Sequence, residues 1–129
     1  MKDKLKQIAE KKLKLDALRP LQKELQDNLD EWYQTELTYS SNAIEGNTLS
    51  RLETAEVIER GTSAIISGKS LKDQLEAINH AKALEFISQI AKKRKSHQNI
   101  SEQDVKNIHK IILTAVEQSL DAYINAANR

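Results

Sequence analysis

Apolar residues recur every three or four positions along most of the chain, which is the spacing that places them on one face of an α-helix. Such stripes cover residues 18–37, 71–95 and 101–118. No segment alternates apolar and polar residues for long enough to predict a β-strand. The pattern therefore predicts an all-α protein of six or seven helices, the last of them a weakly specified helix over residues 120–127.

Serines followed three residues later by a carboxylate predict where three of these helices begin. The pairs are Ser50 with Glu53, Ser70 with Asp73, and Ser101 with Asp104. The first predicts a short helix from Arg51 to about Gly61, and the others predict helices over 71–95 and 101–118. The helix over 71–95 is apolar along one face for its whole length, so we expect it to be the central core helix.

Two segments are expected before these helices. Residues 1–19 form a Lys-rich helix whose lysines either face solvent or make a phosphate-binding arm. Residues 20–50 form an amphipathic helix with Pro20 in its first turn. Its apolar stripe consists of Leu18, Leu21, Leu25, Leu29 and Trp32. This stripe is either the inward face of a helical bundle or a seam for helix pairing and dimerisation.

Composition limits the possible functions. Of the 129 residues, 39% are hydrophobic and 30% are charged, which is typical of a folded, water-soluble chain. The formal net charge of +1 gives no support for a nucleic-acid partner, and no apolar run is long enough to suggest a membrane partner. The absence of cysteine excludes disulfides, and three scattered histidines do not predict a metal site. We expect a cytoplasmic protein.

The most distinctive stretch runs from Ser41 to Asn47. Glu45 lies four residues after Ser41, so the two side chains share one helix face. Gly46 can adopt the left-handed conformation that ends a helix, and Asn47 can continue the turn. A carboxylate at this end of a helix meets the negative end of the helix dipole, so Glu45 is mildly unfavourable there without a cationic partner.

This stretch resembles a motif of the Fic (Fido) family, whose members transfer AMP from ATP to protein hydroxyls. Ser41-x-x-x-Glu45-Gly46 matches the pattern [Ser/Thr]-x-x-x-Glu-[Gly/Asn] of the inhibitory helix in that family. The resemblance extends over roughly residues 28–114, through segments 39–49, 68–71, 76–85 and 108–113. It implies that residues 51–129 are the leading helices of a Fic-like helical bundle that is incomplete at its C-terminal side.

The catalytic loop of the family is absent from these 129 residues. That loop has the form His-x-Phe-x-[Asp/Glu]-Gly-Asn-Gly-Arg-x-x-Arg, and it supplies a general base, a magnesium ligand and phosphate-binding groups. Here the last glycine is Gly68, and no phenylalanine stands two residues after His80, His97 or His109. We therefore expect no catalytic, cofactor-binding or metal-binding residue in this chain, with ATP and magnesium left to the family's loop.

The resemblance implies a role for three residues. In the family, the inhibitory glutamate pairs with the second arginine of the catalytic loop and blocks the productive position of the ATP γ-phosphate. By motif, Glu45 is that glutamate, Ser41 is its supporting hydroxyl, and Gly46 ends the helix.

Three functional hypotheses follow. The first is the N-terminal regulatory part of a Fic-type protein adenylyltransferase, inactive by itself. The second is an antitoxin-like protein that inhibits a separate Fic domain, as in toxin–antitoxin pairs. The third is a non-functional truncated remnant. The expected partners are a Fic catalytic domain, in the same chain or another, and a second copy bound through exposed helix faces.

Overall fold

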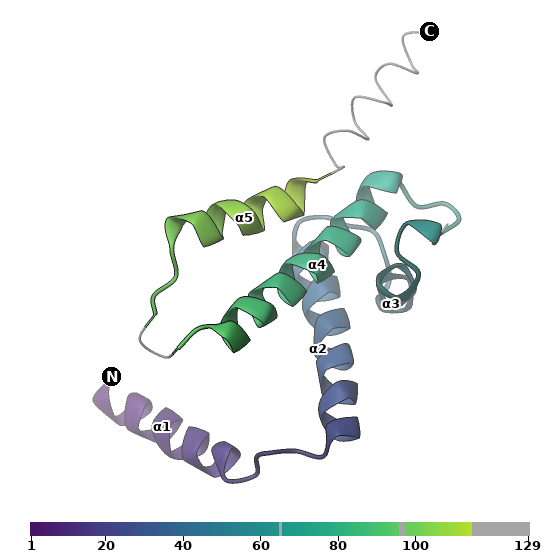
Figure 1. The fold of residues 1–129 in the computed structure, drawn as a ribbon. Helices are drawn as coiled ribbons and strands as arrows, with labels where there is room; N and C mark the ends of the chain where they lie inside the picture. The colour runs from purple at the N-terminus through teal and green to yellow at the C-terminus, as the bar shows by residue number, and fades with distance from the viewer. Residues whose placement is uncertain (65, 96–97, 115–129) are drawn as a thin grey trace, which may run out of the picture. The chain divides into compact units, whose positions relative to one another are not determined.

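The computed structural model describes residues 1–64, 66–95 and 98–114. These residues form an all-helical structure without β-strands, as the sequence predicts (Figure 1). The elements are α1 (Lys2–Asp16), α2 (Lys23–Ile44), α3 (Arg51–Arg60), the short 3-10 helix η1 (Gly61–Ser63), α4 (Leu71–Lys93) and α5 (Glu102–Leu113). The further helix expected over 120–127 lies outside the described residues.

The chain divides into two compact units, Met1–Trp32 and Tyr33–Arg129, with the boundary inside α2. In the first unit, α1 has no buried residue. Leu18 is 67% exposed and Leu25 is 50% exposed, so these two positions of the stripe are not covered within this unit. The physical reason is size, because a unit of 32 residues is too small to enclose a core.

Pro20 also differs from its expected place. The first hydrogen bond of α2 runs from the Gln26 N–H to the Gln22 carbonyl, over 3.0 Å, and the helix proper begins at Lys23. Pro20 therefore belongs to the linker between α1 and α2 and not to the first turn of α2.

The core of the second unit is built around α4, which confirms the prediction of a central core helix over 71–95. It packs against α3, η1 and α5. The largest buried cluster consists of Leu49, Val57, Ala64, Ile66, Ala77 and Ile78. Val57 and Ala77 have exposed fractions of 0% and 1%, so the contact between α3 and α4 lies at the centre of this core.

The helix caps in the second unit follow the local sequence. The Ser50 and Ser101 side chains both form capping boxes, and the Ser70 hydroxyl accepts a hydrogen bond from the backbone N–H three residues later. Gly61 ends α3 with a positive φ of 59°, as expected. The helix expected over 101–118 is shorter than predicted, since α5 ends at Leu113.

Candidate functional site

The C-terminal end of α2 is closed by two backbone hydrogen bonds. The Asn47 N–H donates to the Asn42 carbonyl over 2.9 Å, and the Gly46 N–H donates to the Ala43 carbonyl over 3.1 Å. Together they make a Schellman motif, in which the residue after the cap is left-handed. Gly46 fulfils that requirement with a φ of 91°. This geometry fixes the direction in which the preceding residue, Glu45, leaves the helix.

Glu45 occupies the cap position and is exposed to solvent. Within the part of the chain that the structure describes, no cationic group lies within 4.0 Å of its carboxylate. Ser41 is half-buried on the same helix. Ile44, beside Glu45, is 83% exposed. The tip of α2 therefore presents an apolar side chain and a carboxylate to solvent.

The segment directly after this tip is tied to α4 through Asn47. The Asn47 Nδ2 donates to the Asp73 backbone carbonyl over 2.9 Å and to the Glu76 Oε2 over 3.2 Å. Its Oδ1 accepts a hydrogen bond from the Leu49 N–H over 3.0 Å. The Asn47 Nδ2 thus holds the chain against α4, while its Oδ1 fixes the local turn.

Thr48 adds a second set of contacts to the same helix. Its N–H and its hydroxyl both donate to the Asp73 Oδ2, over 3.0 and 2.5 Å. Lys69 donates to the Thr48 carbonyl and lies 3.6 Å from the Glu53 carboxylate. We call the hydrogen bonds that Asn47 and Thr48 make with Asp73 the Asp73 clamp.

The Asp73 carboxylate is charged in this setting. Asp73 is only 8% exposed, and this burial alone would raise its pKa. Hydrogen bonds from Thr48 and Ser70, together with the nearby Lys72, more than offset this effect and lower its pKa below the usual value. The clamp therefore depends on an ionised carboxylate near the N-terminus of α4, where the helix dipole also favours negative charge.

A second contact fixes α2 about two turns before its tip. Thr38 is fully buried, and its Oγ1 lies 3.0 Å from the His80 Nδ1 on α4. Burial lowers the pKa of His80, which favours the neutral imidazole. Gln34 donates from its Nε2 to the Ala81 carbonyl over 3.4 Å. His80 therefore joins α2 to α4.

Arg51 lies near the motif in sequence but already has partners. Its guanidinium forms an ion pair with Glu36, including a 3.2 Å hydrogen bond from Nη2 to Oε2. It also stacks over the Tyr39 ring at 4.7 Å from the centroid. These contacts join α2 to the start of α3, and they leave Glu45 without Arg51 as a partner.

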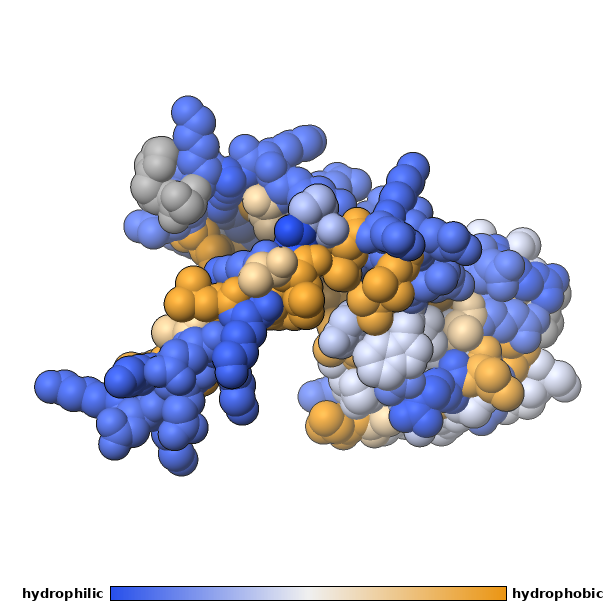
Figure 2. Space-filling view, turned by 90° about the horizontal axis from the view of Figure 1, so that it is seen from below, coloured by the Kyte–Doolittle hydropathy of each residue, from blue (hydrophilic) through white to orange (hydrophobic). Residues whose placement is uncertain are grey.

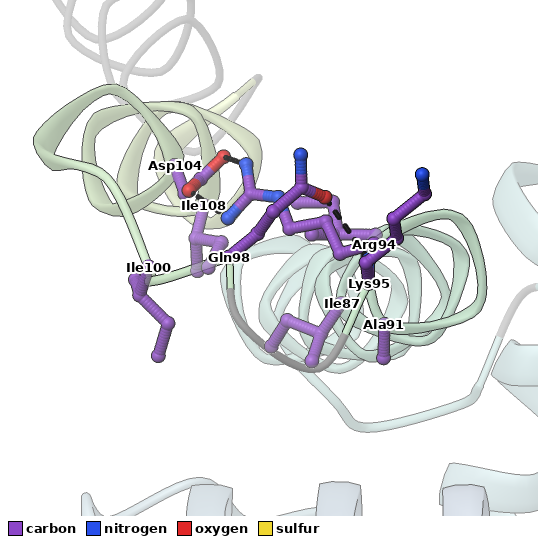
Figure 3. Close-up of a pocket in the computed structure, with 9 residues that line it drawn as sticks. Ile87, Ala91, Arg94, Lys95, Gln98, Ile100, Asp104 and Ile108 are labelled. Atoms are coloured by element: carbon purple, nitrogen blue, oxygen red, sulfur yellow. Dashed lines mark hydrogen bonds and ion pairs between the residues drawn. The ribbon is translucent and has the colours of Figure 1, made fainter.

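A separate hollow of about 420 Å³ lies between the end of α4 and the start of α5 (Figure 3). Its walls are mainly apolar, and they include Ile87, Ile100 and Ile108. On its rim, Arg94 and Asp104 form a two-bonded ion pair, with Nη2 to Oδ1 at 2.7 Å and Nη1 to Oδ2 at 2.6 Å. This pairing holds the pKa of Asp104 well below its usual value, so the Asp104 carboxylate is engaged by Arg94 and is not a free acid or base.

The sequence also raised the questions of a metal site, of the other two histidines and of a membrane partner. The described ranges hold no cluster of three or more His, Cys, Asp or Glu side chains that could bind a metal ion. His109 is exposed, and His97 lies outside the described residues. Among the described helices, none is both long and apolar enough to cross a membrane.

Sequence reasoning missed the residues that hold the tip of α2. Asn47 was expected only to continue a turn, and Asp73 only to cap α4. The signal available in the sequence was the residue type, because the carboxylate of an aspartate can accept more hydrogen bonds than a helix cap requires.

Two curated proteins are similar to part of this chain. Over 75 residues, it is 37% identical to the protein adenylyltransferase fic-1 of Caenorhabditis briggsae and, equally, to that of Caenorhabditis elegans. The aligned stretch is 58% of this chain but only 14% of each relative. No protein-family profile matches the chain, and no solved structure matches it. The partial similarity supports a relationship between this chain and the Fic protein adenylyltransferases.

Proposed function

We propose that this chain provides the inhibitory helix of a Fic-type protein adenylyltransferase, with Glu45 as the inhibitory group. The observation that carries the proposal is the tip of α2, where an exposed carboxylate stands on a closed and anchored helix end and has no cationic partner among the described residues. The family motif at Ser41, Glu45 and Gly46 and the partial similarity to fic-1 support the same function.

The physical basis is an ion pair with an arginine of a Fic catalytic loop. A guanidinium offers two parallel N–H groups to a carboxylate, which gives a directional and strong pair. Glu45 stands at the negative end of the α2 dipole, so a cation there relieves an unfavourable interaction as well as forming a new one. An arginine held in this way is withdrawn from the terminal phosphates of ATP, which is the inhibition that the family resemblance implies.

In this proposal the chain performs no AMP transfer alone, because the family's catalytic loop is absent from its 129 residues. ATP and magnesium are bound by the catalytic domain that Glu45 regulates. That domain is supplied either by the same polypeptide or by a separate toxin-like protein. Ile44, 83% exposed beside Glu45, offers an apolar anchor for the contact in both arrangements.

The test uses the 129-residue chain and an isolated Fic catalytic domain whose own inhibitory helix has been removed. AMP transfer from labelled ATP is measured while the chain is added. We expect the unmodified chain to inhibit, Glu45→Ala to inhibit at least tenfold more weakly, and Glu59→Ala to behave as the unmodified chain. Glu59 is a suitable control because it is an exposed carboxylate on α3.

Circular dichroism of each variant verifies that helix content is unchanged. Equal inhibition by Glu45→Ala and the unmodified chain would contradict the proposed role of Glu45. If the chain inhibits only when it is fused to the catalytic domain, the regulation acts within one polypeptide. Inhibition by the separate chain supports the antitoxin-like arrangement.

A further inference from the structure

The unit Met1–Trp32 exposes apolar side chains that its own residues do not cover. On α1, Leu5 and Ile8 are each 61% exposed and Leu15 is 53% exposed, and on α2 Leu25 is 50% exposed. Figure 2 shows hydrophobic side chains at the surface among hydrophilic ones. An isolated helix of 15 residues, the length of α1, has little stability in water. Its apolar face therefore needs a partner surface.

The stripe on α1 has the spacing of a coiled-coil seam. The inward positions of a seven-residue repeat fall on Leu5, Ile8, Lys12 and Leu15, so all but one of them are apolar. A single polar residue in such a seam specifies the register of the two helices. Lys4 precedes Leu5, and seven residues later Lys11 precedes Lys12. Both lysines therefore flank the same side of the stripe.

The first part of α2 has the same arrangement with the opposite charge. Leu25 and Trp32 are seven residues apart on its stripe. Glu24 precedes Leu25 and Glu31 precedes Trp32, so these two carboxylates flank the same side of the α2 stripe that the lysines flank on α1. The two helices differ in overall charge as well: α1 has six lysines against three carboxylates, and residues 23–32 have four carboxylates against one lysine.

We propose that α1 of one copy packs antiparallel against the first part of α2 of a second copy, and that the chain is a homodimer. In an antiparallel pair of helices, matching flanks face each other, so Lys4 meets Glu31 and Lys11 meets Glu24. A two-fold axis repeats this pairing and covers the stripes of both copies. Pairing with a second copy is favoured over pairing of α1 with α2 of its own chain. Both stripes are exposed within the unit that contains these two segments.

The oligomeric state of the full 129-residue chain tests this pairing. Sedimentation equilibrium over a range of protein concentrations should show a monomer–dimer equilibrium that weakens at high salt, because charged pairs border the seam. Ile8→Glu should give a monomer. Leu13→Glu is the matched control, since Leu13 is on the same helix, is 70% exposed and lies off the stripe. A monomer at every concentration, or equal loss of the dimer in both variants, overturns the proposal.

A charge exchange then identifies the two helices that meet. Replacing Lys4 and Lys11 by glutamate should weaken the dimer by about tenfold, and the further replacement of Glu24 and Glu31 by lysine should restore it. A dimer that is indifferent to both changes contradicts the pairing of α1 with α2. A monomer whose melting temperature follows the same pattern shows that α1 folds onto its own α2, which also overturns the proposal. Glu45→Ala should leave the dimer unchanged, so the outcome is independent of the inhibitory function.

Discussion

Replacing Asp73 by alanine should detach the segment after α2 from α4. Asp73 Oδ2 accepts hydrogen bonds from both the N–H and the hydroxyl of Thr48, and Asp73 is 8% exposed. Leaving a partly buried N–H without an acceptor costs about 1–3 kcal/mol, and loss of a carboxylate from the first turn of a helix costs about 0.3–1 kcal/mol. We expect the free energy of unfolding to fall by about 1–4 kcal/mol.

Urea unfolding followed by circular dichroism measures this loss. Asp73→Asn is the informative companion, because it keeps an oxygen acceptor for Thr48 but removes the charge, and it should lose about half as much stability. Glu59→Ala, at an exposed position on α3, should stay within about 0.5 kcal/mol of the unmodified chain. If Asp73→Ala is as stable as Glu59→Ala, the hydrogen bonds to Thr48 contribute nothing and the assignment of a clamp is refuted.

Three further changes probe other parts of the site. Gly46→Ala should destabilise the chain by about 1–2 kcal/mol in urea unfolding, because the φ of 91° is strained for alanine although a Cβ atom would meet no neighbour. Thr38→Val should cost about 1–2 kcal/mol in the same assay and should raise amide exchange in α2, because it removes the partner of His80. The pKa of Asp104 is lowered in the folded state by its hydrogen bonds with Arg94, so the stability that this carboxylate provides is present above the ordinary value of 3.8 and is lost as the pH falls through the folded value. Asp104→Asn should therefore lower the melting temperature near neutral pH and flatten its decline in acid; an unchanged decline would show that other carboxylates cause it.

Helix starts were predictable because a cap is local. Ser50, Ser70 and Ser101 each stand directly before the helix that the sequence predicts, since the serine and its carboxylate partner are only three residues apart. The end of α5 was not predictable in this way. The Thr114 carbonyl accepts a hydrogen bond from Asn79, 35 residues away on α4, and the backbone leaves the helix at Thr114 with a ψ of 131°. A tertiary contact thus ends a helix that the apolar periodicity would continue.

The exposed stripe on α2 illustrates a second limit of sequence patterns. Periodicity places Leu18 and Leu25 on one face, but it does not say whether another element covers that face. Sequence patterns have the same limit at the C-terminal end of α2. The Ser41–Gly46 motif predicted a closed helix end, and Gly46 confirms it through its φ value. Nothing in the pattern connects Thr48 to Asp73, because they are 25 positions apart and the chain between them contains all of α3 and η1.

The position of Glu45 is unfavourable for the isolated chain, and in the proposed function it favours binding of an arginine. At the negative end of α2 an unpaired carboxylate costs about 0.3–1 kcal/mol, which is less than the Asp73 clamp contributes by the estimate above. The clamp holds the backbone on one side of Glu45 and the Schellman motif holds it on the other, so an arginine that binds Glu45 orders little beyond one side chain. Asp73→Ala should therefore weaken inhibition of a Fic catalytic domain even though every group that touches the arginine is still present. Asp73→Asn, which keeps an oxygen acceptor for Thr48, should inhibit better than Asp73→Ala. If both Asp73 variants inhibit as well as the unmodified chain, the clamp does not contribute to the binding of Glu45.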